Sequence, residues 1–181
     1  MVRINNILVF LMLLFGIVFI FIDYRYKFFF IFFFISFFVA IIFSYMLKRM
    51  DLNENYNILI SISLWLNLFG DLGLYSYFQY YDKVLHIIIP ILITAILCSY
   101  FYKKEFTNKI LIFFSVMGIL ASFEIYEWTI QTIFDFQMMG VISGGEMVLS
   151  YIDDTIIDLI LGGLSSIGYL YLTWKKKKFY L

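Results

Sequence analysis

Six long apolar stretches constrain the fold of this chain more than any other feature. They cover residues 4–22, 28–47, 58–78, 84–102, 110–134 and 155–174. Each is close to the roughly 20 apolar residues that a membrane-spanning helix needs. Charged residues make up 14% of the chain, whereas a soluble domain carries about 25%. The sequence therefore predicts an all-α fold: a polytopic membrane helical bundle in which residues 1–181 form a single domain of six transmembrane helices.

Two of the stretches are less regular than the others. The third is interrupted by polar and small residues, namely Asn67, Gly70, Asp71 and Gly73, and is expected to be the weakest span. The first could be read as a signal peptide, but its apolar run is long and no small-residue cleavage site follows it. A retained first helix is therefore the expectation.

The positively charged residues between the stretches predict the orientation, because cytoplasmic loops are enriched in Lys and Arg. One side holds ten of them: Arg3, Lys48, Arg49, Lys103, Lys104, Lys109 and residues 175–178. The other side holds three: Arg25, Lys27 and Lys83. This asymmetry predicts a multi-pass protein of the cell (cytoplasmic or inner) membrane, with both termini in the cytoplasm and the lipid bilayer as its surroundings.

Polar side chains inside the apolar stretches come in pairs, although each ionisable one costs on the order of 2.5–3.5 kcal/mol near the membrane centre. The pairs are Asn67 with Asp71, Asp82 with His86, Glu124 with Glu127, and Asp154 with Asp158. Spacings of three or four residues place both members on one helix face. With the orientation above, all of them fall within roughly 15 Å of the outer face, so we expect the pairs to meet at one level.

The expected cluster is rich in carboxylates and poor in cations. Lys83, expected at the rim, and His86 are the cationic candidates. Carboxylates packed together must be protonated or must hold a cation, and one imidazole with several carboxylate oxygens suits Zn²⁺, Mg²⁺, Mn²⁺ or Ca²⁺. We therefore predict a divalent metal ion whose candidate ligands are Asp82, His86, Glu127, Asp154 and Asp158. Glu124 is the candidate catalytic general base.

Simpler interpretations apply to single members of this set. Asp154 could be the N-cap of the last helix, and Asp82 could cap the fourth. His86 could be a hydrogen-bonded histidine of the core. The two glutamates of the fifth stretch fit a purely structural role least well, because both are ionisable and lie on one face inside an apolar helix.

The segment between the last two stretches, residues 135–154, is long and carries no Lys or Arg. It contains Gly144 and Gly145 together with several apolar side chains. Long loops in compact proteins are often functional. A half-buried lid or re-entrant turn on the outer side is one expectation, and a plain surface excursion is the alternative.

Three short motifs stand in order along the second half of the chain. They are Tyr81-Asp82-Lys83-Val84-Leu85-His86 followed by Pro90, Glu124-Ile125-Tyr126-Glu127-Trp128, and Asp154-Thr155-Ile156-Ile157-Asp158 followed by Gly162. They resemble the Tyr-Asp-x-x-x-His, Glu-x-x-Glu-Trp and Asp-Thr-x-x-Asp segments of the YjdF-like inner-membrane protein family, and more loosely the Asp-Lys-x-x-His of VanZ-like proteins. Asp153 departs from that family, which usually has Trp there. The resemblance supports the site residues and leaves the activity open.

Three functions fit these observations. The first is a metal-dependent hydrolase or transferase acting on a lipid or lipid-linked substrate. The second is a cation or proton transporter, although the polar pairs within the helices all lie at one depth and no repeat of broken helices is evident. The third is a non-catalytic membrane partner, such as an immunity subunit, with a structural ion. A nucleic-acid role is excluded because no soluble basic patch exists, and the single Cys98 offers no thiol metal motif.

Overall fold

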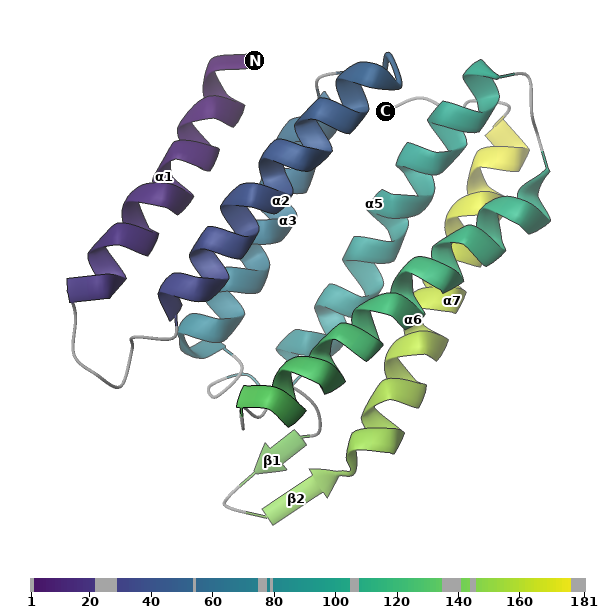
Figure 1. Ribbon diagram of the computed structural model, residues 1–181. Helices are drawn as coiled ribbons and strands as arrows, with labels where there is room; N and C mark the ends of the chain where they lie inside the picture. The colour runs from purple at the N-terminus through teal and green to yellow at the C-terminus, as the bar shows by residue number, and fades with distance from the viewer. Residues whose placement is uncertain are drawn as a thin grey trace. The chain divides into compact units, whose positions relative to one another are not determined.

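Helices predominate in the computed structural model of the protein (Figure 1). It describes residues 2–21, 29–53, 55–74, 78, 80–104, 108–134, 141–143 and 146–176. The elements are α1 (Val2–Phe21), α2 (Phe29–Arg49), α3 (Asn55–Phe69), η2 (Gly70–Leu74), α5 (Tyr81–Lys103), α6 (Lys109–Phe134), β1 (Val141–Ser143), β2 (Glu146–Leu149) and α7 (Tyr151–Lys176). The helices agree with the predicted class. The antiparallel hairpin β1–β2 is an addition to it, and Gly144 and Gly145 lie outside the described residues.

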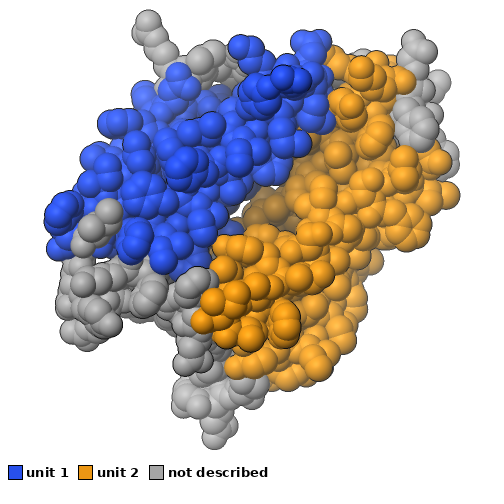
Figure 2. Space-filling model, in the orientation of Figure 1, with its two compact units in different colours: residues 1–78, 181 blue, residues 79–180 orange. Residues whose placement is uncertain are grey.

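The chain divides into two compact units, coloured blue and orange in Figure 2. Unit 1 comprises residues 1–78 and 181, and unit 2 comprises residues 79–180. Unit 1 contains α1, α2, α3 and η2, whereas unit 2 contains α5, α6, the hairpin and α7. All the candidate site residues belong to unit 2.

Four of the described helices are long and apolar enough to cross a membrane. These segments are Phe30–Arg49, Tyr81–Lys103, Lys109–Ile133 and Tyr151–Thr173. The apolar part of α1, Ile4–Phe19, and the 15-residue α3 are shorter. Six α-helices are therefore present in the described part of the chain, and four of them have the length and composition of a membrane span.

The third helix ends earlier than its sequence predicts. α3 stops at Phe69, and the next five residues, Gly70–Leu74, form the π-helical η2. Single π-helical turns occur where the regular hydrogen-bond ladder is disturbed. The interruption indicated by Gly70 and Asp71 is thus real, and the prediction of one helix across residues 58–78 is wrong in its C-terminal extent.

Aromatic and aliphatic side chains from all three helices form the core of unit 1. Its buried members are Met12, Phe33, Ala40, Trp65 and Leu68. The indole Nε1 of Trp65 donates a hydrogen bond to the carbonyl oxygen of Leu8 at 3.1 Å. The Ser61 hydroxyl donates to the side-chain oxygen of Asn5 at 2.7 Å. These bonds join α1 to α3 and satisfy polar groups that water cannot reach.

In unit 2, α5 and α7 pack closely at Gly162. A methyl group at this position would lie 2.5 Å from Cδ1 of Leu120 and 3.2 Å from Cγ of Pro90, so a larger residue requires its neighbours to move. One turn further along α7, the hydroxyls of Thr94 and Ser166 are hydrogen-bonded at 3.1 Å. Small residues and interhelical hydroxyl bonds are the usual means by which membrane helices approach each other.

Pro90 stands inside α5 and is buried. Because proline has no N–H, the carbonyl oxygen of His86 lacks the helical hydrogen bond that residue 90 would otherwise donate. The Thr94 hydroxyl donates to the carbonyl oxygen of Pro90, four residues earlier, at 2.6 Å, a bond that threonine often makes within helices. The ladder of α5 is therefore interrupted at the turn that carries His86.

The last helix begins at Tyr151, four residues before its predicted start at residue 155. Ser150 precedes it, and its Oγ accepts a hydrogen bond from the backbone N–H of Asp153 at 3.2 Å and donates to the Asp153 carboxylate at 2.6 Å. A serine followed three positions later by an acidic residue is a usual helix start. Asp154 therefore lies inside the first turn and is not the N-cap.

Candidate functional site

The first turns of α5 and α7 and the last turns of α6 lie at the same end of unit 2 (Figure 1). Seven polar side chains from these three helices gather there. We call them the polar cluster: Asp82, Lys83, His86, Glu124, Glu127, Asp154 and Asp158. Asp82 and Glu127 are half-buried, and the other five are buried. The structure thus brings the paired residues of the last three helices together. Asn67 and Asp71 belong to unit 1, which is described separately.

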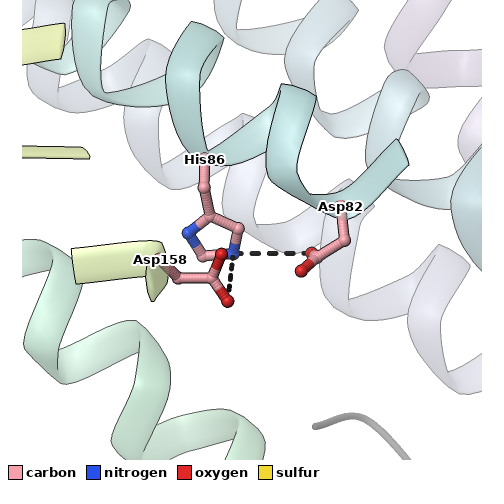
Figure 3. Close-up of side chains that lie close together, drawn as sticks. All are labelled: Asp82, His86 and Asp158. Atoms are coloured by element: carbon pink, nitrogen blue, oxygen red, sulfur yellow. Dashed lines mark ion pairs between the residues drawn. The ribbon is translucent and has the colours of Figure 1, made fainter. Parts of the chain in front are cut away.

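His86 lies between carboxylates from three helices. Its Nε2 is 3.5 Å from Oδ1 of Asp82 and 3.9 Å from Oδ2 of Asp158 (Figure 3). Its Nδ1 is 3.8 Å from Oε1 of Glu124. The two ring nitrogens therefore face different carboxylates, and Phe123 packs against the ring with 6.3 Å between centroids.

Lys83 is buried in the cluster and does not lie at the rim, which corrects the expectation from its position near the helix start. Its Nζ donates to Oδ2 of Asp82 at 3.0 Å and to the two oxygens of Asp158 at 2.8 and 2.7 Å. It also donates to Oδ1 of Asp154. An ammonium group has three N–H donors, so three carboxylates use its whole donor capacity. The flexible four-carbon stem lets the charge reach inward from the helix end.

Neither Asp82 nor Asp154 is a helix cap. The N-cap position of α5 is Tyr80, which makes no side-chain capping bond, and the Asp82 carboxylate contacts Lys83 and His86 instead. Asp154 forms an ion pair with Lys83. The interpretation of these two aspartates as caps is therefore wrong, and both belong to the polar cluster.

Two groups within the described residues have a geometry that can hold a metal ion. One consists of Asp82, His86 and Asp158, and the other of His86, Glu124 and Glu127. In each group the ligand atoms lie within 4.8 Å of one another. Atoms that bind one ion at about 2.0–2.6 Å lie no more than about 4–5 Å apart, so both groups fit a divalent ion. His86 belongs to both, and Asp154 to neither.

A comparison with protein families matches the description "Predicted membrane protein (DUF2238)" over residues 4–178. The chain belongs to the DUF2238 family. YjdF-like proteins are members of the same family, so the resemblance carried by the three motifs is confirmed. No curated protein and no solved structure matches the chain. With four apolar helices of spanning length, this DUF2238 protein is a multi-pass membrane protein.

The structure adds to the sequence-based site of the DUF2238 protein chiefly through Lys83. The sequence predicts Lys83 at the rim, one residue before a span that begins at residue 84, whereas α5 begins at Tyr81. Its partner Asp158 lies 75 residues further along the chain. No local sequence pattern predicts such a contact. Ser150, in contrast, had a readable signal, because it precedes Asp153 by three residues at the start of an apolar run.

Proposed function

We propose that this DUF2238 protein binds a divalent cation in its polar cluster and acts as a hydrolase or transferase on a lipid or lipid-linked substrate. The observation that carries the proposal is the position of His86, which two metal-compatible groups share. Five carboxylates surround one lysine and this imidazole, so a cation offsets an excess of negative charge that is costly to bury.

The residues of the polar cluster would have different roles, as metal ligands or as general base. His86 and Glu127 would hold the ion, and Asp82 and Asp158 are the alternative ligands on the other side of the imidazole. Asp154 would act through its ion pair with Lys83. A bound ion would supply Lewis acidity toward a phosphoryl or carbonyl oxygen of the substrate. Glu124 is 5% exposed and 3.8 Å from His86, a position from which it could accept a proton as general base.

The distribution of charge along the three helices supports a site at one end of the bundle. Charged residues and histidine are absent from the sequence between residues 87 and 102, between residues 110 and 123, and between residues 159 and 174. A proton or cation path across the membrane needs polar groups along its length. A site at the level of lipid headgroups therefore explains the pattern better than a transport path does.

The orientation in this proposal follows the distribution of Lys and Arg. Both termini would lie in the cytoplasm of a bacterial-type cell membrane, because ten of the thirteen basic residues would then be on that side. The polar cluster would open toward the outer leaflet. Cysteine accessibility labelling of single-cysteine variants in intact cells would test this topology.

Metal analysis of the detergent-purified chain tests the proposed function. We expect the wild type to retain a divalent ion, and Glu127→Gln and His86→Asn to lose it. Asp153→Asn is the matched control, since Asp153 is exposed and lies outside the cluster on α7. An ion-free wild type whose Tm does not change with Mn²⁺, Zn²⁺, Ca²⁺ or Mg²⁺ would sink the proposal. Loss of lipid cleavage or transfer in Glu124→Gln, with the fold intact, would support the enzyme.

A further inference from the structure

Lys83 gives the polar cluster a fixed positive charge of its own. We infer that its ammonium group occupies the place of a second metal ion and thereby limits the cluster to one divalent ion. The inference rests on the proposed function, because it specifies how the same site is loaded. Lys83 is thus a positioning residue, which acts on the ion through the carboxylates that it holds.

The ammonium and one of the two metal-compatible groups use the same carboxylates. Asp82 and Asp158 complete that group with His86, and both already bond to the Nζ of Lys83. Both oxygens of Asp158 are engaged, at 2.8 and 2.7 Å. A metal ion in this group would have to compete with the ammonium for Asp158.

The other metal-compatible group has no such competitor. Among the described residues, neither Glu124 nor Glu127 forms an ion pair with a lysine or arginine. Glu124 faces Nδ1 of His86, whereas Asp82 and Asp158, which Lys83 holds, face Nε2. A single ion would therefore lie on the Nδ1 side, with Glu124 and Glu127 beside it.

Charge repulsion gives the reason for one ion and not two. Coulomb energy scales with the product of the charges. Two divalent ions repel each other twice as strongly as a divalent ion and an ammonium group at the same separation. Two-metal sites place their ions about 3.5–4 Å apart, a distance at which this difference matters. Removing the lysine would remove the resident charge and leave three carboxylates for a second ion.

Counting Mn²⁺ ions bound to the full chain in detergent tests the inference. We expect one ion in the wild type and in Lys83→Arg, which keeps the charge, and two in Lys83→Met. In Lys83→Met, two neighbouring Mn²⁺ ions should also show spin coupling by electron paramagnetic resonance. Lys104→Met is the matched control, because Lys104 is exposed at the other end of α5, and it should bind one ion. If the wild type binds one ion, a folded Lys83→Met that also binds one ion, or binds none, overturns the inference.

A second readout covers a Lys83→Met chain that is unfolded without metal. In that case Mn²⁺, but not an equal ionic strength of NaCl, should restore its Tm, and failure of this rescue overturns the inference. The outcomes also separate this inference from the proposed function. If the wild type binds no ion, the proposed function fails. The assignment of Lys83 then stands if Lys83→Met binds one ion, and it falls if that variant binds none.

Discussion

Lys83 and Asp158 form a bidentate ion pair between α5 and α7, with Nζ 2.8 and 2.7 Å from the two carboxylate oxygens. The aspartate is 2% exposed. Buried pairs of this kind contribute little net stability relative to apolar residues, but loss of one partner leaves an uncompensated charge. The pair therefore fixes how α5 and α7 meet at the end that carries the site.

Replacement of Asp158 by asparagine should lower the free energy of unfolding by about 3 kcal/mol. The value lies at the low end for broken buried pairs because Lys83 keeps Asp82 and Asp154. Asp153→Asn should lower it by only about 0.3–1 kcal/mol, because it removes one negative charge from the first turn of α7 but keeps an oxygen acceptor for Ser150. Thermal unfolding in detergent measures both, and equal losses in the two variants would contradict the central position of Asp158.

Gly162→Ala should destabilise unit 2 by about 1–3 kcal/mol, the usual cost of overpacking. The added methyl group would lie 2.5 Å from Leu120 and 3.2 Å from Pro90. Gly168→Ala is the control, since no described neighbour lies within 4 Å of a methyl group there. Because alanine favours helix more than glycine does, this change should raise the free energy of unfolding by up to about 1 kcal/mol. Opposite signs of the two changes in Tm are the expected result.

Ser150→Ala should lower the free energy of unfolding by about 1 kcal/mol, because it removes the acceptor for the backbone N–H of Asp153. Ser150→Asp keeps an acceptor and should retain most of the stability. Hydrogen exchange at the first turn of α7 should accelerate in the alanine variant alone. Equal exchange rates in the two variants would mean that Ser150 is not the cap.

Ser166→Ala should lower the free energy of unfolding by about 0.6 kcal/mol, the average contribution of a hydrogen bond between membrane helices. Its hydroxyl is bonded to Thr94 on the neighbouring helix. The neighbouring Ser165 bonds to the carbonyl oxygen of Leu161 in its own helix, so Ser165→Ala should have a smaller effect. Thermal unfolding of both variants in the same detergent measures the two losses of stability. A larger loss of stability in Ser165→Ala than in Ser166→Ala would contradict the prediction.

Much of the fold could be predicted from the sequence because membrane helices are specified locally. The length of each apolar run predicted the six helices, and the polar and small residues around Gly70 predicted the disturbance that the structure places in η2. The residue at which α3 ends was harder to predict, since a π-helical turn depends on how the backbone accommodates its neighbours. The start of α7 could have been read from Ser150 and Asp153.

The sequence predicted which residues form the polar cluster, but it did not predict which side chains contact one another. Helical spacing brought Glu124 and Glu127, or Asp154 and Asp158, to one face of their helices. The inward direction of Lys83 follows from partners on α7, and such tertiary contacts leave no periodic pattern in a sequence. For the same reason the opposite environments of the two nitrogens of His86 required coordinates.

The missing helical hydrogen bond at Pro90 makes the backbone of His86 compliant. Elsewhere in a membrane helix, a small shift of one turn stretches a hydrogen bond where no water can replace it. The carbonyl oxygen of His86 has no such bond to lose, so the peptide group after His86 can shift at a lower cost than elsewhere in the helix. The ion pair between Lys83 and Asp158 still holds the first turn of α5 against α7, so any such adjustment is confined to the turn that carries His86.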